Sequence, residues 1–377
     1  MKLRRATGIW LSLGLAAACG SSSKSPGGDF TETPDGDINS GSSSGGGSTP
    51  EGGTPGGPSD ATTGSTTPTT GVEGGTTYAE GGAGAPDAKP EAAPATGPQE
   101  AGTILDGNGG TCPTPSGLTA NQTEALTIVN QTRAAIGSPC ATMVATLNTS
   151  ATDHCNYYAA NLSSSTCIAD AHVEVSGCTD YVAAQFYTRE TDAGYTGSPS
   201  AEDMAFDDDG TAALGQWINS VWHRTPILSP WTRDYGYGSA TMCDTMDFGV
   251  GATAPSDLIV TYPYDGQTGV PTSFAGNEEG PAPPMPPNGW PSGYPVHVFI
   301  QGMNLGTTIT THEFSVVGGA QLAHQWVTPE TPNAVLEDAV VLYGNEPLTA
   351  NTTYLVHVAG TGAGGAAVDV NITFTTE

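Results

Sequence analysis

Apolar residues recur at helical spacing through much of the chain between residues 118 and 228. In "LTANQTEALTIVNQTRAAIG", four of them share one helical face: Ala125, Leu126, Val129 and Ile136. Thr119 with Gln122, or Asn121 with Glu124, is spaced as a capping box, which marks a helix start. The pattern predicts a helix that ends at Gly137.

Three more helical segments are expected after it. "SATDHCNYYAANLS" repeats apolar residues every three to four positions, and His154 lies off that stripe, so we interpret it as a surface histidine. A second segment is predicted around residues 181–188, and Ser200 with Asp203 is typical of a helix start. In "TAALGQWINSVWHR", one face carries Leu214, Trp217, Ile218 and Val221 until Pro226 stops the helix.

The pattern then changes to alternation. "DYGYGSATMCDTMDFGVG" has the glycines and the period of two that predict paired strands. Helices come first and strands last, which predicts an α+β domain over residues 116–252. Further on, "VDVNITFTTE" and "TTYLVHVAG" alternate apolar and polar residues, and "YPVHVFIQ" and "DAVVLYG" are further short strands. Residues 254–377 therefore form a predicted β-sandwich. We interpret His297, His312, His324 and His357 as surface polar residues in it.

The chain begins like an exported protein. "MKLRRATGIWLSLGLAAACG" has a basic start, a short apolar core and small residues, which predicts a signal peptide over residues 1–19. Alanines before Cys19 and Gly20 after it resemble a bacterial lipobox, so Cys19 is the expected lipidation site. The alternative is ordinary signal cleavage with an incidental cysteine. We expect a lipoprotein of the bacterial cell envelope, at the surface or periplasmic face of the outer membrane.

Residues 20–115 are rich in Gly, Ser, Thr and Pro and almost lack aromatic residues, which predicts a disordered, low-complexity linker.

The net charge of the chain limits the binding partners that can be expected. The sequence has 9 Lys plus Arg against 38 Asp plus Glu, with no Lys or Arg after Arg233. A phosphate backbone would be repelled, so nucleic acid is excluded as an expected partner. The densest acidic run, "FDDDG", lacks the alternating ligand spacing of a calcium loop and is interpreted as a solvated loop.

Six cysteines remain if Cys19 carries lipid. This even number in an oxidising compartment predicts three disulfides. They are Cys112, Cys140, Cys155, Cys167, Cys178 and Cys243. Six cysteines allow about fifteen connectivities, and the sequence does not choose among them. A zinc-cysteine site is the alternative, although the chain has no Cys-x-x-Cys pair.

The motifs "VNQTRAAIG", "AHVEV", "YTGSPSAEDMAF", "WINSVWHRTPILSP", "GYGSA" and "DFGVG" follow, in this order, the pattern of bacterial CAP superfamily domains, also called SCP domains. The resemblance implies a three-layer α-β-α sandwich with a cleft of histidines and acids. Carried over by motif position, the cleft residues are His172, Glu174, Glu202 and His223, and the metal ligands are His172, Glu202 and His223. The chain has Ala201-Glu202-Asp203 where the family usually has Gly-Glu-Asn.

Two imidazoles and a carboxylate offer the donors that a divalent metal such as zinc accepts, which would leave one position open. Taken without the motif, His223 is a cation at a helix C-terminus, and Glu174 is a solvated strand-edge carboxylate. Arg224 is expected to pair with an acidic neighbour. The catalytic residues remain unknown: the predicted domains have no Gly-x-Ser-x-Gly elbow, and Ser220, which precedes His223 by three residues, is interpreted as a packing or capping serine.

The C-terminal region resembles bacterial Ig-like domains in "VTYPYDGQTGVPTSF" and "PLTANTTYLVHV". Its insertion "EEGPAPPMPPNGWPSGYP" is expected to pack Trp290 and Tyr294 on the sandwich; a polyproline-type partner site is the alternative. We therefore expect an exported, lipid-anchored protein that binds a lipid, peptide or surface partner through the His/Glu cleft. The alternatives are a metal-dependent or serine hydrolase of extracellular peptides or polymers, and a structural spacer or adhesion unit.

Overall fold

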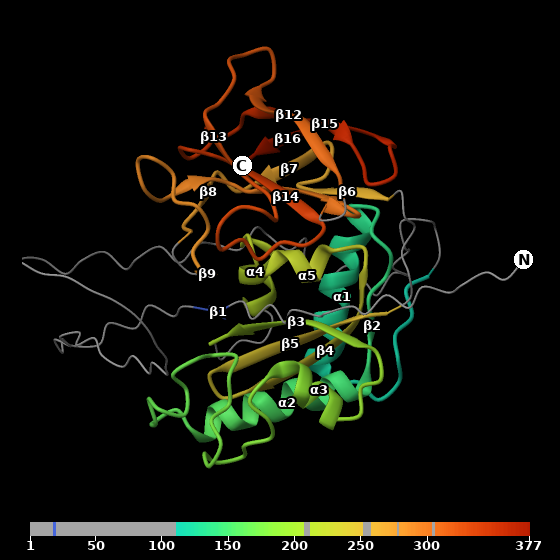
Figure 1. Cartoon of the computed structure of the whole chain (residues 1–377), viewed down its shortest axis with the longest axis vertical. Coiled ribbons are helices and arrows are strands. Elements are labelled where there is room, and N and C mark those ends of the chain that lie inside the picture. The colour runs from blue at the N-terminus through green and yellow to red at the C-terminus, as the bar shows by residue number, and fades with distance from the viewer. Residues whose placement is uncertain (1–17, 20–110, 207–211, 252–257, 277–278, 304–305) are drawn as a thin grey trace, which may run out of the picture. The chain divides into compact units, whose positions relative to one another are not determined.

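The computed structural model of the chain describes residues 18–19, 111–206, 212–251, 258–276, 279–303 and 306–377, with backbone only at 18–19 (Figure 1). The predicted signal peptide, most of the predicted linker and most of the "FDDDG" run lie outside the described residues. Below, residues 111–251 are called the α/β part and residues 258–377 the β part. No helix among the described residues is long and apolar enough to cross a membrane.

The α/β part contains helices and one sheet. Its helices are α1 (Ala120–Ala135), α2 (Ala145–Ala160), α3 (Phe186–Asp192), α4 (Ala212–Ile218) and α5 (Arg224–Leu228). Its strands are β2 (Thr142–Met143), β3 (Ser198–Ala205), β4 (Thr232–Ala240) and β5 (Cys243–Val250), in the sheet order β2-β4-β5-β3. Helices α2 and α3 cover one face of this sheet, and α1, α4 and α5 cover the other (Figure 1). The α/β part thus has three layers, as the sequence resemblance implies.

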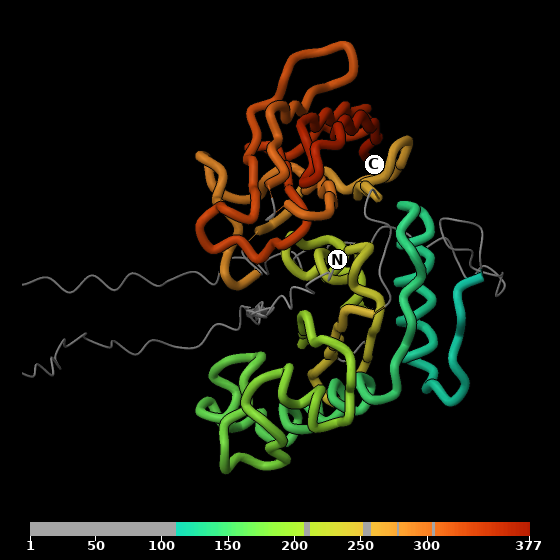
Figure 2. Tube along the Cα trace, turned by 45° about the vertical axis from the view of Figure 1, so that its right-hand side comes forward, coloured from blue at the N-terminus to red at the C-terminus, as the bar shows by residue number. Residues whose placement is uncertain are grey.

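Helix α1 forms as its sequence predicts. The Thr119 side chain accepts from the backbone N–H of Gln122, and the Gln122 side chain accepts from the backbone N–H of Thr119, so the capping box is closed. Ala125, Leu126 and Val129 are buried against the sheet. Helix α2 runs in a clearly different direction from α1 in both views (Figures 1 and 2).

Two glycines of β4 allow α2 to lie directly on the sheet. A Cβ atom at Gly236 would come within 2.2 Å of the backbone of Leu147, and one at Gly238 within 2.2 Å of the backbone N of Thr152. Any other residue would push the helix away from the strand, because Cβ cannot occupy that space. The "GYGSA" motif is therefore a packing requirement of α2 against β4.

Three of the predicted elements differ in the structure. The helix predicted to start at Ser200 is strand β3, which pairs antiparallel with β5. Here pairing with a neighbouring strand overrides the local capping signal. The segment predicted around residues 181–188 is helical only from Phe186 to Asp192. The helix expected to run to Pro226 is broken after Ile218, and Pro226 lies inside the short α5.

The β part is a sandwich of two four-stranded sheets. Their orders are β13-β14-β11-β6 and β12-β15-β16-β7. The strands are β6 (Ile259–Tyr262), β7 (Gln267–Val270), β11 (Val296–Ile300), β12 (Thr308–Val316), β13 (His324–Val327), β14 (Ala339–Gly344), β15 (Thr353–Thr361) and β16 (Ala367–Thr376). Short strands β8 (Ser273–Phe274) and β10 (Ser292–Gly293) pair with each other, and β9 (Glu279–Gly280) pairs with β1 (Ala18–Cys19). The predicted sandwich is confirmed, and so is its inward set of Val368, Val370, Ile372 and Phe374.

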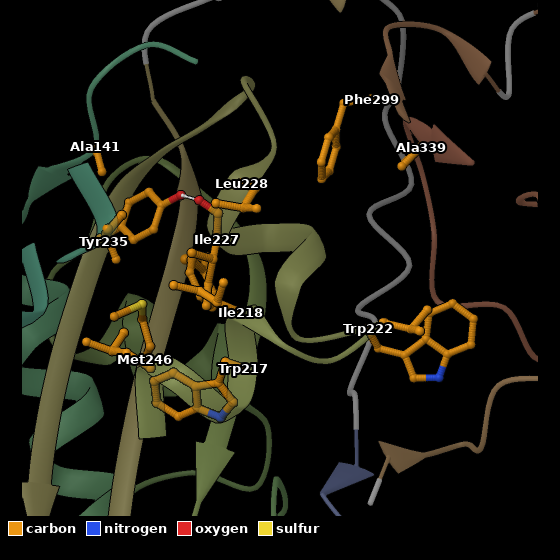
Figure 3. Close-up of a cluster of buried hydrophobic side chains, with 14 of the residues drawn as sticks. Ala141, Trp217, Ile218, Trp222, Ile227, Leu228, Tyr235, Met246, Phe299 and Ala339 are labelled. Atoms are coloured by element: carbon orange, nitrogen blue, oxygen red, sulfur yellow. Dashed lines mark hydrogen bonds between the residues drawn. The ribbon is translucent and has the colours of Figure 1, made fainter. Parts of the chain in front are cut away.

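Strands β11 and β14 are buried on both faces. Val296, Val298 and Ile300 point into the sandwich core, whereas Phe299 belongs to a second core that contains Trp222 of the α/β part (Figure 3). His297 is fully buried on the same side as Phe299. The interpretation of His297 as a surface residue is therefore wrong, because the outer face of this sheet packs against protein rather than water.

The six cysteines from 112 to 243 form the three predicted disulfides. The pairs are Cys112–Cys140, Cys155–Cys243 and Cys167–Cys178. They tie the segment before α1 to the segment before β2, α2 to β5, and the two ends of a short loop after α2 to each other. Disulfides of this kind persist in oxidising compartments, which fits an exported protein.

Candidate functional site: a buried acid and histidine cluster

Seven ionisable side chains lie together between the sheet and the layer of α2 and α3. We call them the acid–histidine cluster: His154, His172, Glu174, Arg189, Glu190, Glu202 and Asp247. Each residue is at most 1% exposed. They come from α2, the loop 161–185, α3, β3 and β5. Four of them are carboxylic acids and one is an arginine, so the cluster holds more acids than fixed cations.

Glu202 and His172 form the centre of the cluster. The Nδ1 atom of His172 lies 2.9 Å from Oε1 of Glu202, and the carboxylate can only accept in this bond. Nδ1 therefore carries the proton. The other ring nitrogen, Nε2, is buried and has no hydrogen-bond partner among the described residues. In the neutral ring this Nε2 has a free lone pair, held in a fixed orientation by Glu202.

His154 and Glu174 form a second pair beside the first. The Nδ1 atom of His154 lies 2.9 Å from Oε1 of Glu174, and Nε2 lies 2.9 Å from the carbonyl oxygen of Ala171. Each ring nitrogen of His154 therefore faces an oxygen atom of the cluster or of its loop. The second oxygen of Glu174 accepts from the backbone N–H of Val182. His154 is thus a buried, hydrogen-bonded histidine, and its interpretation as a surface residue is wrong.

Arg189 supplies the cluster's permanent positive charge. Its Nη2 donates to Oε2 of Glu202, and its guanidinium also donates to the carbonyl oxygens of His172, Ala183 and Ala184. These bonds tie the loop 161–185 to α3 and β3. Arg189 and the two histidines lower the pKa of Glu202 despite its burial, so Glu202 is ionised.

For two further acids, the positive charge of Arg189 does not outweigh the effect of burial. Burial, together with the neighbouring charges of Asp247 and Glu202, raises the pKa of Glu190 to about 10. Burial and Glu202 likewise raise the pKa of Asp247 well above its usual range. Neither carboxylate oxygen of Glu190 has a hydrogen-bond partner among the described residues. At neutral pH these two acids therefore hold their protons.

His223 lies on the other side of β3. Neighbouring residues of a strand point to opposite faces of the sheet. Asp203 follows Glu202 directly in β3, so its side chain lies on the face opposite the acid–histidine cluster. The charges that act on Asp203 include those of His223 and Glu279, and burial raises its pKa well above the usual range. The Nδ1 atom of His223 lies 3.3 Å from Oε1 of Glu279 in the β part. His223 is only 4% exposed and sits between α4 and α5.

The structure therefore divides the predicted site residues. It brings His172 and Glu202 together and places Glu174 beside them through His154 and Arg189. It places His223 with Asp203 and Glu279 instead. Among the described residues, no group of three His, Cys, Asp or Glu side chains is arranged to hold a metal ion. Of the predicted ligand set, His172 and Glu202 are hydrogen-bonded to each other, whereas His223 contacts Glu279.

The neighbours of His223 have packing roles. The Ser220 hydroxyl donates to the carbonyl oxygen of Trp217, 2.8 Å away, as expected of a packing or capping serine. Among the described residues, Arg224 forms no ion pair with an acid; its hydrogen bonds go to carbonyl oxygens and to His297. Its guanidinium is buried between the rings of Tyr262 and Tyr294 and donates to the carbonyl oxygen of Pro295. The expectation of an acidic partner for Arg224 is wrong, because aromatic faces and carbonyl oxygens take that place.

Sequence reasoning missed His154, Arg189, Glu190 and Asp247. His154 was interpreted as a surface residue and no role was predicted for the other three, yet all four are buried. One signal was available: Arg189 is one of few basic residues in a chain with a formal charge of −29. A rare arginine among many acids is often a buried partner of carboxylates.

Comparisons with known proteins find only weak similarity to solved structures. No family model matches the chain, and no curated protein matches it. One similar solved structure is an extracellular protein containing an SCP domain from Bacillus anthracis str. Ames, with 20% identity and a TM-score of 0.30 over 37% of this chain. The match covers 45% of that protein, so this chain spans less than half of it. Another is PcoC, a copper resistance protein from Escherichia coli, with 14% identity and a TM-score of 0.19 over 31% of this chain and 95% of that one.

Proposed function

We propose that this chain is an exported, lipid-anchored protein of the bacterial cell envelope that binds a cationic ligand at the acid–histidine cluster. In this proposal the α/β part is a CAP-type domain, the β part is an Ig-like module, and Cys19 carries the lipid. The ligand is a divalent metal such as zinc or the cationic group of a peptide or surface partner. Turnover is not part of the proposal.

The observation that carries the ligand proposal is the free Nε2 of His172. A carboxylate that accepts a hydrogen bond from Nδ1 of a histidine fixes the ring and makes Nε2 more basic. Nε2 then gives its lone pair to a metal more readily, and this is the common arrangement behind a metal-binding histidine. Glu202 therefore has the role of orienting His172 rather than that of a ligand. The protonated acids nearby support the same conclusion, since an entering cation would release their protons and ionise them.

Export and anchoring rest on the N-terminal sequence and on the three disulfides. Metabolic labelling with a palmitate analogue tests the anchor. Wild type should incorporate the label and partition into detergent, whereas Cys19→Ser should do neither. A labelled Cys19→Ser protein would contradict lipidation at Cys19.

Zinc titration calorimetry on the full chain tests the cluster. His172→Ala removes the free Nε2, so we expect at least about a tenfold loss of affinity. His223→Ala is the matched control, because it removes a buried histidine on the opposite face of β3. Both variants are checked by circular dichroism and for intact disulfides.

Saturable zinc binding that is lost in His172→Ala and kept in His223→Ala would support the cluster as the binding site. No saturable binding in wild type, or equal binding in wild type and His172→Ala, would contradict the proposal and favour the structural alternative. The hydrolase alternative gains no support from Ser220, whose hydroxyl donates to a backbone carbonyl. This alternative predicts that the wild-type protein hydrolyses a peptide or an ester and that His223→Ala abolishes the hydrolysis.

A further inference from the structure

Two histidines from different sheets of the β part meet at one edge of the sandwich. His312 lies on β12, an edge strand of one sheet, and His324 starts β13, an edge strand of the other. The Nδ1 atom of His312 and the Nε2 atom of His324 are 3.0 Å apart. We call these two residues the edge histidine pair. They are twelve residues apart in sequence, so no local motif reveals them.

We propose that the edge histidine pair binds a divalent transition metal ion, with Nδ1 of His312 and Nε2 of His324 as its two protein ligands. Metal–nitrogen bonds of about 2.0–2.1 Å, at angles between about 90° and 109°, place neighbouring ligand nitrogens about 2.8–3.4 Å apart. The observed separation of 3.0 Å lies inside that range. The two nitrogens are thus at the right separation to share a metal ion, once each ring turns so that its lone pair points at the ion instead of along the line between the nitrogens.

The proton positions favour this role. The Nδ1 atom of His324 lies 2.9 Å from the carbonyl oxygen of Leu322, which can only accept, so Nδ1 carries the proton and Nε2 has a lone pair. A backbone carbonyl that holds the far nitrogen is a common support of a ligating histidine. His312 then shares its own Nδ1 proton with His324. On binding, the metal takes the place of this proton, which moves to Nε2 of His312 and leaves the ring neutral.

The surroundings hold both rings in position while leaving His312 accessible. His312 stacks on Trp326, with ring centroids 4.4 Å apart and an interplanar angle of 5°. The rings of His312 and His324 are nearly perpendicular, at 89°. His312 is exposed and His324 is half-buried, so an ion and its remaining water ligands can reach the pair. The formal charge of −29 attracts cations to the chain.

Imidazole nitrogens suit copper, nickel and zinc, and among divalent ions of this series Cu²⁺ binds such ligands most tightly. Cu²⁺ is therefore the probe. The full chain is titrated with Cu²⁺ and followed by tryptophan fluorescence and by electron paramagnetic resonance. Because His312 stacks on Trp326, an ion bound at the pair quenches this tryptophan. Trp326→Phe shows which part of the quenching arises there.

We expect saturable Cu²⁺ binding with a spectrum that shows two nitrogen ligands. His312→Ala and His324→Ala should each weaken this binding at least about tenfold. His357→Ala is the matched control: it removes another partly exposed histidine of the β part, and the affinity should stay within about twofold of wild type. Absence of saturable quenching from Trp326, or equal affinity in wild type and both pair variants, would overturn the proposal. This outcome is independent of the acid–histidine cluster, which His312 and His324 do not contact.

Discussion

The Nη1 atom of Arg224 lies 3.1 Å from the Nδ1 atom of His297, so the α/β part and the β part share a buried hydrogen bond. The Nε2 atom of His297 is 2.9 Å from the carbonyl oxygen of Val221, to which it donates. Burial and the Arg224 charge lower the pKa of His297 well below its usual range, so the ring is neutral and Nδ1 accepts from Arg224. One arginine thereby fixes the loop between α4 and α5 to strand β11.

Replacing Arg224 should destabilise the whole described fold. Arg224→Lys keeps the charge but loses the planar group between Tyr262 and Tyr294, so we expect a loss of about 2–4 kcal/mol in the free energy of unfolding. Guanidinium denaturation measures it. Arg233→Lys is the control, since Arg233 is half-buried and its Nε donates to the carbonyl oxygen of Cys140; it should cost about 1 kcal/mol or less. Equal losses would contradict the special role of Arg224.

Glycine at the contact of α2 with β4 should be irreplaceable. Gly236→Ala places a Cβ atom on the backbone of Leu147, so we expect a loss of about 2 kcal/mol or more and a lower melting temperature. Gly364→Ala is the matched control, because its Cβ would meet no atom within 4 Å. A Gly236→Ala protein as stable as the control would show that α2 does not rest on β4 as described.

The three disulfides should differ in their contribution to stability. Cys155–Cys243 closes a loop of 88 residues and Cys167–Cys178 a loop of 11. If the effect on the unfolded chain dominates, replacing the first pair by alanines should cost about 4–5 kcal/mol and the second about 3 kcal/mol. Chemical denaturation of the two double variants checks this order. The reverse order would show that local packing outweighs loop length.

The protonated state of Glu190 predicts how stability depends on pH. Its pKa is raised from the ordinary value near 4.3 in the unfolded chain to about 10 in the folded one, so the folded state binds more protons between these values. Its contribution to stability is fully present below about pH 4 and is lost as pH rises toward 10. Glutamine does not titrate, so Glu190→Gln does not lose this contribution. The free energy of unfolding of the variant should therefore rise relative to that of wild type from pH 5 to pH 9.

Denaturation at pH 5, 7 and 9 measures this gain, with the exposed acid variant Glu124→Gln as control. The difference between Glu190→Gln and wild type should grow with pH, and Glu124→Gln should show no such growth. A Glu190→Gln protein whose difference from wild type is the same at all three values would contradict the protonated, uncompensated state of Glu190.

The sequence predicted those features that depend on neighbouring residues. The capping box of α1, the strand pair β4 and β5, and the inward row of β16 follow from local pattern, and the structure has all of them. Strand β3 was missed because Ser200 and Asp203 are typical of helix starts, whereas pairing with β5 decides its conformation.

Burial of charge was the main failure of the sequence prediction. His154 and Arg189 have polar side chains that pattern reasoning assigns to the surface, yet each finds acceptors within the cluster. His297 was also assigned to the surface, although β11 is buried on both faces; the consecutive apolar residues Val298, Phe299 and Ile300 were the available signal. The resemblance pointed to His172 and Glu202 as neighbours but placed His223 with them, because a motif does not show on which face of β3 a side chain lies.

The central claim is that the Nε2 atom of His172 receives a cation. Crystals of the full chain grown with zinc, measured on both sides of the zinc absorption edge, test it most directly. We predict an anomalous peak about 2.0–2.1 Å from this nitrogen, with Glu202 still bonded to Nδ1. Crystals at saturating zinc with no peak at the acid–histidine cluster would contradict the claim and leave the cluster as an internal ionic core.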